Sequence, residues 1–511
     1  MPEKKIMNRN FVVFGAIIIQ LCLGAIYAWS VFTPALTAKP SELVGIYSAE
    51  QLNISEKQYG DLKEFTEDKN SYIDSLNSEI DSLMTEKDIT IDNEKDSLLI
   101  IALNKKITDA KKITNIKTEE IIPEDTRNNL LFGFSKTQTQ GVFAAGLAFF
   151  AIVMVIAGRL MPKLGPKKLA MSGGLVLGLG YLLAGLCGGT NFWLIFIFVG
   201  IIGGSGIGLA YVVPIAVGMR WFPDKKGLIT GLAVAGFGFG ATLWVKLAGT
   251  WGNLIANYNL SGTFTIYGII FFLAVVLGSI WMVFPPEGWK PKGWKPTKIQ
   301  KKADSSTKQL KSGEMLKTPQ FYLILLTFAF GASAGLMTIG LMKLFPMQAL
   351  ENAGFSTLVA SGIAGTAMAV FFSLANGLGR IAWGAISDKL GRKKSIVLMM
   401  ITQGIFVISF QWIAGTPGLL YLGATLIGFN FGGNFALFPT ITADTFGTKY
   451  IGQNYGWVFL AYGIGGIFGP IMGGKLGDMN NFPLAFTICG ILCLLAAFII
   501  SRVKPVALKT A

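Results

Sequence analysis

Long apolar runs separated by short polar segments dominate this chain. Twelve of them can cross a hydrocarbon core about 30 Å thick, because a helix rises about 1.5 Å per residue. They lie near residues 11–36, 139–161, 167–188, 191–219, 226–250, 261–284, 320–346, 357–387, 394–414, 417–440, 451–476 and 482–502. The pattern predicts an all-α membrane protein with twelve transmembrane helices.

The spans repeat at a nearly constant interval. A shift of 225 residues places Gly227 on Gly452, and a shift of 226 places Gly158 on Gly384. Matches of this kind extend over four spans. They predict two pseudo-symmetric six-helix halves in parallel orientation, which is typical of transporters that rock around a central site.

The repeat also sets the domain boundaries. We expect an N-terminal half over 1–284, a Pro- and Lys-rich linker over 285–318 and a C-terminal half over 319–511. The first spans of the halves match only at an offset of 310, which is 84 more than 226. The difference predicts an insertion of that size between the first two spans, at about 42–130.

The insertion is polar and acidic and has no spanning segment. Ile73, Leu76, Ile80 and Leu83 follow a 3-4-3 spacing, which predicts a short helical hairpin or coiled coil. Two roles stay open for it. One is a cap or flexible loop, and the other is partner binding or gating.

Composition excludes several classes of protein. The chain is 52% hydrophobic and only 14% charged, which does not suit a soluble protein of 511 residues. It has no histidine, and its four cysteines do not form a metal-ligand pattern. The glycine-rich runs lack the strand–helix context of a nucleotide-binding loop. We therefore predict neither a cofactor nor enzymatic activity.

The charged residues indicate the orientation in the membrane. Of the 29 acidic residues, 20 lie between Lys39 and Lys136, and the net charge of +15 comes from lysines and arginines in short loops. Those basic loops recur on one side of the membrane, the side of both termini. The positive-inside rule predicts that this side is cytoplasmic and that the insertion is extracytoplasmic, in the plasma (inner) membrane. The basic balance therefore reflects topology rather than nucleic-acid binding.

One permanent cation lies deep in an apolar span. Counted from the turn at Asp388, Arg380 is roughly 12 Å and Asn376 roughly 18 Å into the membrane, on either side of the midplane. A charge at that depth costs a few kcal/mol or more, which makes it a candidate functional site. No carboxylate of the sequence lies at its depth, so we expect the counter-ion to be the substrate.

A loop motif follows this span. Gly384, Asp388, Gly391 and Arg392 match the G-x-x-x-D-x-x-G-R-K loop of the major facilitator superfamily, which the chain resembles. Asp388 can cap the N-terminus of a neighbouring helix while the basic residues stay in water, and such a latch would hold one conformation. The first-half copy has Pro162 in place of the acid.

Four further motifs extend the resemblance: GAIYAW at 24–29, YVVP at 211–214, NGLGR at 376–380 and NYGWVFLAYG at 454–463. Together they closely resemble the oxalate/formate antiporter family over nearly the whole chain except the insertion. The resemblance implies exchange or uptake of small carboxylates by alternating access. It also implies that a basic residue at the Arg380 position binds the anion.

The resemblance breaks at a second basic position. The family's oxalate carriers bind their dianion with a further lysine on span eleven, and here that position looks like Tyr462. One cation and one phenol suit a monocarboxylate such as lactate, pyruvate or formate better than oxalate.

Depth along each helix suggests further ligands. Counting about 15 Å from the cytoplasmic helix ends places five residues near the midplane, on spans that line the cavity in the superfamily: Gln20, Tyr211, Phe237, Phe435 and Tyr462. Phe431 lies one turn beyond them. Tyr27 is nearer the outer face, where gating and binding are both open.

These residue types predict distinct roles. Arg380 would clamp the carboxylate with paired N–H donors, and Asn376 could bond a carboxylate or hydroxyl oxygen. Tyr211 and Tyr462 could donate hydroxyls, while the phenylalanines exclude water. Helix packing is the competing explanation for Asn376, Tyr211 and the phenylalanines, and bonding to backbone carbonyls is that for Arg380.

The sequence thus predicts a secondary transporter of small carboxylates, working as an exchanger or as a facilitated or proton-linked carrier. The alternative is a non-transporting carboxylate sensor that signals through the insertion or the linker. The expected partners are a small carboxylate anion and the lipid bilayer, with no nucleic acid, and the expected state is a monomer.

Overall fold

The chain is an all-helical bundle in the computed structural model, which describes residues 7–85, 94–249, 251–291, 309–342, 344–355, 357–479 and 481–504. Within these residues, eleven helical segments are long and apolar enough to cross a membrane. The twelfth, α20 (Pro417–Phe446), has 30 residues but is less apolar because it carries the buried Asn430 and Asn434. The predicted all-α fold with twelve transmembrane helices is confirmed.

The first half holds six of these helices, and some of them are built from consecutive segments. The first span is α1 (Asn10–Leu23), η1 (Gly24–Val31) and α2 (Thr33–Thr37). The other five are α7 (Lys136–Leu164), α8 (Pro166–Cys187), α9 (Phe192–Ile195) continued by η3 (Phe196–Gly203) and α10 (Gly204–Trp221), α11 (Lys226–Ala248) and α12 (Leu254–Ser279).

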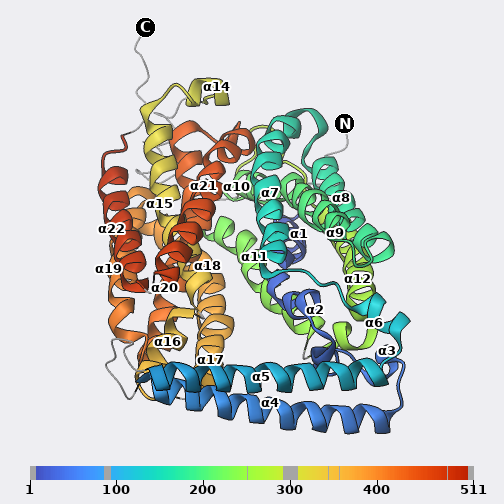
Figure 1. The fold of residues 1–511 in the computed structure, drawn as a ribbon. Helices are drawn as coiled ribbons and strands as arrows, with labels where there is room; N and C mark the ends of the chain where they lie inside the picture. The colour runs from blue at the N-terminus through green and yellow to red at the C-terminus, as the bar shows by residue number, and fades with distance from the viewer. Residues whose placement is uncertain are drawn as a thin grey trace.

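The linker, of which residues 292–308 lie outside the described part, contains the short α14 (Ser312–Met315). The second half follows it. Its spans are α15 (Pro319–Leu341), α17 (Thr357–Thr366) continued by η4 (Ala367–Phe372) and α18 (Ser373–Leu390), α19 (Arg392–Ile413), α20, α21 (Ile451–Asp478) and α22 (Phe482–Ser501), with α16 (Leu344–Asn352) between the first two. The two halves stand side by side (Figure 1).

The sequence repeat becomes two equivalent helix crossings between the halves. A Cβ added to Gly158 of α7 would lie 2.2 Å from the carbonyl oxygen of Gly452 of α21. A Cβ added to Gly384 of α18 would lie 2.3 Å from the carbonyl oxygen of Gly227 of α11. Only glycine allows backbones to approach this closely. The four glycines that matched in the sequence therefore meet in two pairs, each of which joins one half to the other.

The insertion lies across one end of the bundle (Figure 1). It consists of η2 (Pro40–Gly45), α3 (Ala49–Leu52), α4 (Glu56–Thr85), α5 (Glu94–Ile121) and α6 (Glu124–Leu130). The two long helices form a hairpin with its own core of Ile73, Leu76, Leu103, Ile107 and Ala110, against which Ile80 packs. The 3-4-3 spacing predicted a short hairpin, and the helices have 30 and 28 residues. The side chain of Leu83 and residues 86–93 lie outside the described part.

The insertion is attached to the first half. The backbone amide of Ser48 donates to the carbonyl of Ala256 at 3.0 Å. The side-chain amide of Gln51 donates to the backbone carbonyl of Asn257 at 2.9 Å. We call this end of the bundle the insert face and the end with the termini the opposite face.

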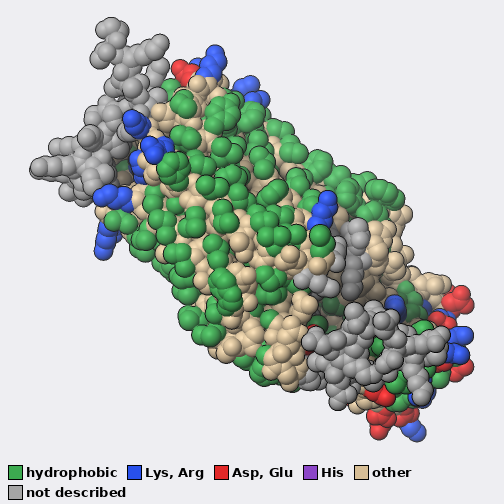
Figure 2. All heavy atoms as spheres, turned by 60° about the vertical axis from the view of Figure 1, so that its left-hand side comes forward, with side chains coloured by type: hydrophobic (Ala, Val, Ile, Leu, Met, Phe, Trp, Pro, Cys, Tyr) green, Lys and Arg blue, Asp and Glu red, His purple; other side chains and the backbone are tan. Residues whose placement is uncertain are grey.

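The sides of the bundle suit a lipid environment. Apolar side chains cover the middle of the molecule in Figure 2, whereas charged side chains gather towards its two ends. Large apolar side chains of α19 and α22 are strongly exposed, among them Ile405, Trp412, Ile491 and Phe498. A soluble protein rarely exposes such an apolar surface, whereas lipid tails cover it without cost.

We expect the helix crossings to tolerate no added volume. A Cβ at Gly379 of α18 would lie 1.9 Å from the backbone oxygen of Phe429 of α20, whereas Gly474 of α21 has open space around it. Gly379→Ala should therefore cost about 1–3 kcal/mol of stability through overpacking, and Gly474→Ala should be neutral or slightly stabilising. Thermal unfolding of both variants in detergent measures the difference, and equal midpoints would contradict the close crossing.

Candidate functional site

Arg380 lies where α18 meets helices of both halves. Close backbone contacts at glycines hold α18 against its neighbours. A Cβ added to Gly432 of α20 would lie 2.0 Å from the backbone oxygen of Asn376. On the other side, a Cβ on Gly231 of α11 would lie 2.2 Å from the backbone oxygen of Arg380. The side chain of Arg380 therefore enters the interface between the halves rather than the lipid.

The guanidinium of Arg380 is fully buried and only partly satisfied. Its Nε donates to Oδ1 of Asn376 at 3.2 Å, and its Nη1 donates to the carbonyl of Val234 at 2.9 Å. Its Nη2 has no hydrogen-bond partner. Its Cζ lies 4.1 Å from the ring centroid of Phe435 and 5.7 Å from that of Phe237. No carboxylate of the described residues pairs with it, so its charge is balanced only by dipoles and ring faces.

Two tyrosines link the halves beside this cation. The hydroxyls of Tyr27, on η1, and Tyr462, on α21, share a short hydrogen bond. Depth along the first span had placed Tyr27 nearer the outer face, where gating and binding were both open. The structure brings it into contact with Tyr462, so Tyr27 belongs to the same cluster as Arg380.

Tyr211 and Gln20 form a second polar pair in the first half. The side chain of Gln20 donates through Nε2 to the carbonyl of Tyr211 at 3.1 Å. Its Oε1 and the hydroxyl of Tyr211 are buried and have no partner. Each of these two residues therefore has one polar atom at the site that is available to a ligand.

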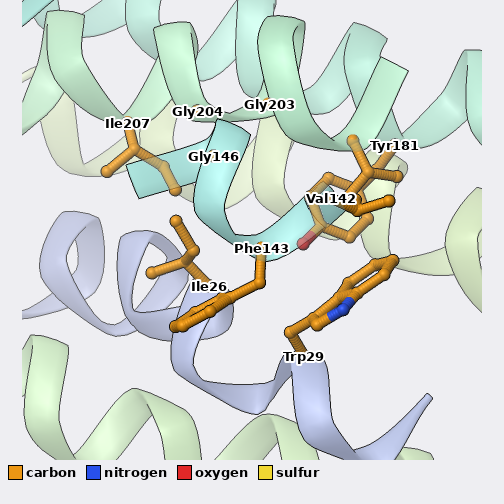
Figure 3. Close-up of a pocket in the computed structure, with 10 residues that line it drawn as sticks. Ile26, Trp29, Val142, Phe143, Gly146, Tyr181, Gly203, Gly204 and Ile207 are labelled. Carbon is orange, nitrogen blue, oxygen red and sulfur yellow. The ribbon is translucent and has the colours of Figure 1, made fainter. Parts of the chain in front are cut away.

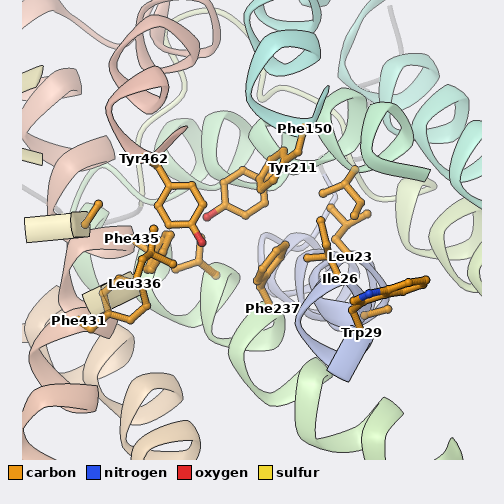
Figure 4. Packing of buried hydrophobic residues seen from close by; sticks show 14 of the residues in the cluster. Leu23, Ile26, Trp29, Phe150, Tyr211, Phe237, Leu336, Phe431, Phe435 and Tyr462 are labelled. Carbon is orange, nitrogen blue, oxygen red and sulfur yellow. The ribbon is translucent and has the colours of Figure 1, made fainter. Parts of the chain in front are cut away.

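The two candidate phenylalanines differ in their position. Phe435 lies beneath the guanidinium, and its ring centroid is 5.4 Å from that of Tyr462. Phe431 lies on the far side of Phe435 from the guanidinium, with 5.4 Å between the two ring centroids, and it packs against Gly335. Figure 4 shows Phe431, Phe435 and Tyr462 on one side and Tyr211, Phe150 and Phe237 on the other. Phe435 is thus a contact of the cation, and Phe431 supports it from behind.

Sequence reasoning missed Tyr455 of α21 as a candidate. Its side chain is fully buried, its hydroxyl has no partner, and its ring centroid lies 5.7 Å from that of Phe459. A signal for it existed, since it precedes Tyr462 by seven residues, or two helical turns, on the same face of α21. Phe459 was missed as well, although it contacts both Tyr211 and Tyr462.

A separate small pocket lies within the first half (Figure 3). Its lining includes no charged side chain: Ile26, Trp29, Val142, Phe143, Gly146, Tyr181, Val199, Gly203, Gly204 and Ile207. It offers no counter-ion to an anion, so the cluster around Arg380 remains the candidate site.

The motif at the end of α18, with Asp388 in its last turn, joins the two halves at the opposite face. Oδ1 and Oδ2 of Asp388 each accept a hydrogen bond of 2.9 Å, from the backbone amides of Gly227 and Leu228 at the start of α11. The carboxylate thus satisfies amides that have no partner within their helix and lies at the positive end of its dipole. The turn behind it depends on Gly391, whose φ is +89°.

The side chain of Arg392 was predicted to stay in water, but the structure buries most of it. Its side chain is only 11% exposed and donates to Asp388 at 2.7 Å and to Asp444 of α20 at 3.1 Å. Lys226 of α11 adds a contact of 3.4 Å to Asp444. The expectation was wrong because it counted one carboxylate, whereas the fold brings a second one from α20.

The equivalent crossing in the other pair of helices has no such carboxylate. Pro162 lies inside α7 at the position of the acid. The connection before α21 is instead held by Arg220, which donates to the carbonyl of Lys449 at 2.6 Å. The side chain of Asn454 also bonds the linker, at the carbonyl of Leu310. The two crossings thus share their glycines but not their charges.

A family model described as Major Facilitator Superfamily matches residues 121–372 and 360–510. The chain belongs to the Major Facilitator Superfamily. Proteins of this superfamily are membrane transporters rather than enzymes, and the predicted resemblance is confirmed at this level.

Curated relatives of this superfamily member include three carriers. It is 26% identical over 327 residues to an uncharacterized MFS-type transporter, YhjX, of Escherichia coli, covering 64% of this chain and 75% of the relative. It is 28% identical over 305 residues to the oxalate:formate antiporter of Oxalobacter formigenes, covering 58% and 68%. It is 23% identical over 364 residues to the apicoplast pyruvate carrier 1 of Toxoplasma gondii, covering 62% and 66%.

Solved structures show the same fold. The proton:xylose symporter XylE matches with a TM-score of 0.59 and 13% identity, over 97% of this chain and 96% of that chain. The human organic anion transporter MFSD10 matches with a TM-score of 0.58 and 13% identity, over 97% and 100%. Similarity at this level of identity concerns the fold alone.

We expect Asp388→Asn to loosen this transporter at the opposite face. The substitution removes a charge that binds two helix amides and Arg392, which should weaken the contact of α11 with α18 by about 1–3 kcal/mol. Spin labels on Lys168→Cys and Lys394→Cys, in a chain without its native cysteines, should report longer and broader distances.

Asp224→Asn is the matched control for this experiment. Asp224 also pairs with an arginine, Arg9 at 2.9 Å, but both of these residues belong to the first half. Its loss should leave the label distances unchanged. The same distances in wild type and Asp388→Asn would contradict a bridging role of Asp388.

Proposed function

We propose that this protein is a secondary transporter of small organic anions, with a monocarboxylate such as lactate, pyruvate or formate as its substrate. One observation carries the proposal. Arg380 is a fully buried cation between the two halves, and its Nη2 has no partner. A carboxylate supplies both the missing charge and the missing hydrogen-bond acceptor.

Charge balance favours a single negative charge on the substrate. Arg380 is the one cation among the described groups that surround the site. By the family resemblance, Tyr462 stands where the oxalate carriers have their second basic residue, and its hydroxyl bonds that of Tyr27. A dianion would carry an uncompensated charge into the buried site, at a cost of several kcal/mol.

The named relatives agree with this class of substrate. One is called an oxalate:formate antiporter, and another is called a pyruvate carrier. Both names concern small carboxylates. All three relatives are named as transporters, antiporters or carriers, so we do not propose the alternative of a sensor.

Alternating access would use the contacts at the opposite face as a latch. Gly384 and Gly391 allow the close crossing and the turn, and Asp388 and Arg392 supply the charges that hold α18 on α11. Release of these contacts would open the site towards that face. The positive-inside rule supports a cytoplasmic position of this face in the plasma membrane, with the insertion outside. There the hairpin would act as an extracytoplasmic cap.

We expect Arg380→Lys to lower carboxylate uptake about tenfold or more. Lysine keeps the charge but loses the planar fork that bonds Asn376, Val234 and the substrate at once. Uptake of labelled lactate, pyruvate and formate into proteoliposomes measures the effect. Arg502→Lys, at the end of α22 with its guanidinium over the ring of Phe498, is the matched control and should transport normally. Near-normal uptake by Arg380→Lys would count against a carboxylate clamp.

The coupling of transport can be tested in the same vesicles. No Asp, Glu or His is among the described residues that surround Arg380, so these residues offer no carboxylate or imidazole for a proton relay. We expect uptake to be stimulated mainly by a carboxylate inside the vesicles. Uptake driven by an imposed pH gradient, with no counter-anion inside, would instead show proton-linked transport and refute obligate exchange.

A further inference from the structure

Four buried polar atoms at the site have no hydrogen-bond partner. They are Nη2 of Arg380, Oε1 of Gln20 and the hydroxyl oxygens of Tyr211 and Tyr455. An unsatisfied buried polar group destabilises a fold by about 1–3 kcal/mol. Such groups are rare in native proteins, and several together indicate a polar ligand.

Three of these atoms belong to one part of the site. The ring centroids of Tyr211 and Tyr455 lie 5.4 Å and 5.7 Å from that of Phe459, so both tyrosines border the same ring. Gln20 joins them through its bond to the carbonyl of Tyr211. Tyr455 also lies close enough to Tyr211 and Arg380 to interact electrostatically with both. We call Gln20, Tyr211 and Tyr455 the hydroxyl pocket.

The hydroxyl pocket is chemically distinct from the carboxylate clamp. Arg380 already has Asn376 beside it as a second polar group for a carboxylate. Tyr27 and Tyr462 satisfy each other. The two free phenols can donate to an oxygen or accept from a hydroxyl. Oε1 of Gln20 is an amide oxygen, so it can only accept a hydrogen bond.

We propose that the substrate is a short hydroxy- or oxo-monocarboxylate, bound by its carboxylate to Arg380 and by its second oxygen to the hydroxyl pocket. The inference rests on the proposed carboxylate transport and narrows it. A substrate hydroxyl accepts from Tyr211 or Tyr455 and donates to Gln20. A substrate oxo group accepts from the phenols. Formate, acetate and propionate have no second polar group and leave the pocket unsatisfied.

This assignment predicts a large discrimination. A site built to bond a substrate hydroxyl rejects the analogue that lacks it more strongly than an apolar pocket rejects an extra methylene. Lactate and propionate have the same carbon skeleton and the same charge, and they differ by one hydroxyl. We expect the wild-type protein to transport lactate, and likewise pyruvate, with at least about tenfold higher kcat/KM than propionate.

Two variants locate the discrimination. Tyr455→Phe and Tyr211→Phe each remove one oxygen and keep the ring, so each should lower kcat/KM for lactate about fivefold or more and leave propionate nearly unchanged. Tyr181→Phe is the control, because its ring packs against Phe264 and Phe271 inside the first half. It should change neither substrate.

The outcomes separate the two proposals. Equal kcat/KM of lactate and propionate in the wild-type protein would mean that water satisfies the hydroxyl pocket, and this would overturn the inference while carboxylate transport stands. Equal losses for both substrates in Tyr455→Phe would give that residue a structural role and remove it from the pocket. Transport of no carboxylate at all by the wild-type protein would refute the proposed function and the inference together.

Discussion

The structure depends on keeping one guanidinium charged at the interface of two apolar helix bundles. Arg380 is fully buried, so the fold must stabilise its charge with dipoles and ring faces. Asn376, the carbonyl of Val234 and the ring of Phe435 supply part of this stabilisation. One donor, Nη2, is left without a partner. The incomplete shell makes the position suitable for an anion, because a full set of protein partners would leave it nothing to bind.

Close backbone contact between the halves makes this arrangement possible. The glycine pairs Gly158–Gly452 and Gly227–Gly384 bring α7 against α21 and α11 against α18. Small residues also let helices slide or separate with little change of packed volume. Crossings of this kind are compatible with the alternating access that we propose for this transporter.

The two helix crossings between the halves have the same close backbone contact but different charged residues. At α11 and α18, Asp388, Arg392, Asp444 and Lys226 form a connected set across the halves. At α7 and α21, Pro162 replaces the acid, and hydrogen bonds from Arg220 and Asn454 hold the connection before α21 and the linker. Salt and charge substitutions should therefore act mainly on the first of these crossings. The hairpin is attached at the other end of the bundle, to the first half.

The features of the fold and site that depend on one helix at a time could be predicted from the sequence. Span length, the repeat near 226 residues, the depth of Arg380 and the loop with Asp388 follow from helical rise and residue order. The sequence did not reveal which atoms meet across helices. Val234 and Arg380 are 146 residues apart, and Tyr27 and Tyr462 are 435 apart. The burial of Arg392 with Asp444 and the free hydroxyl of Tyr455 were missed for the same reason. Helical rise fixes the height of a residue in the membrane, whereas its partners depend on how each helix is rotated and crossed by its neighbours, which only tertiary packing decides.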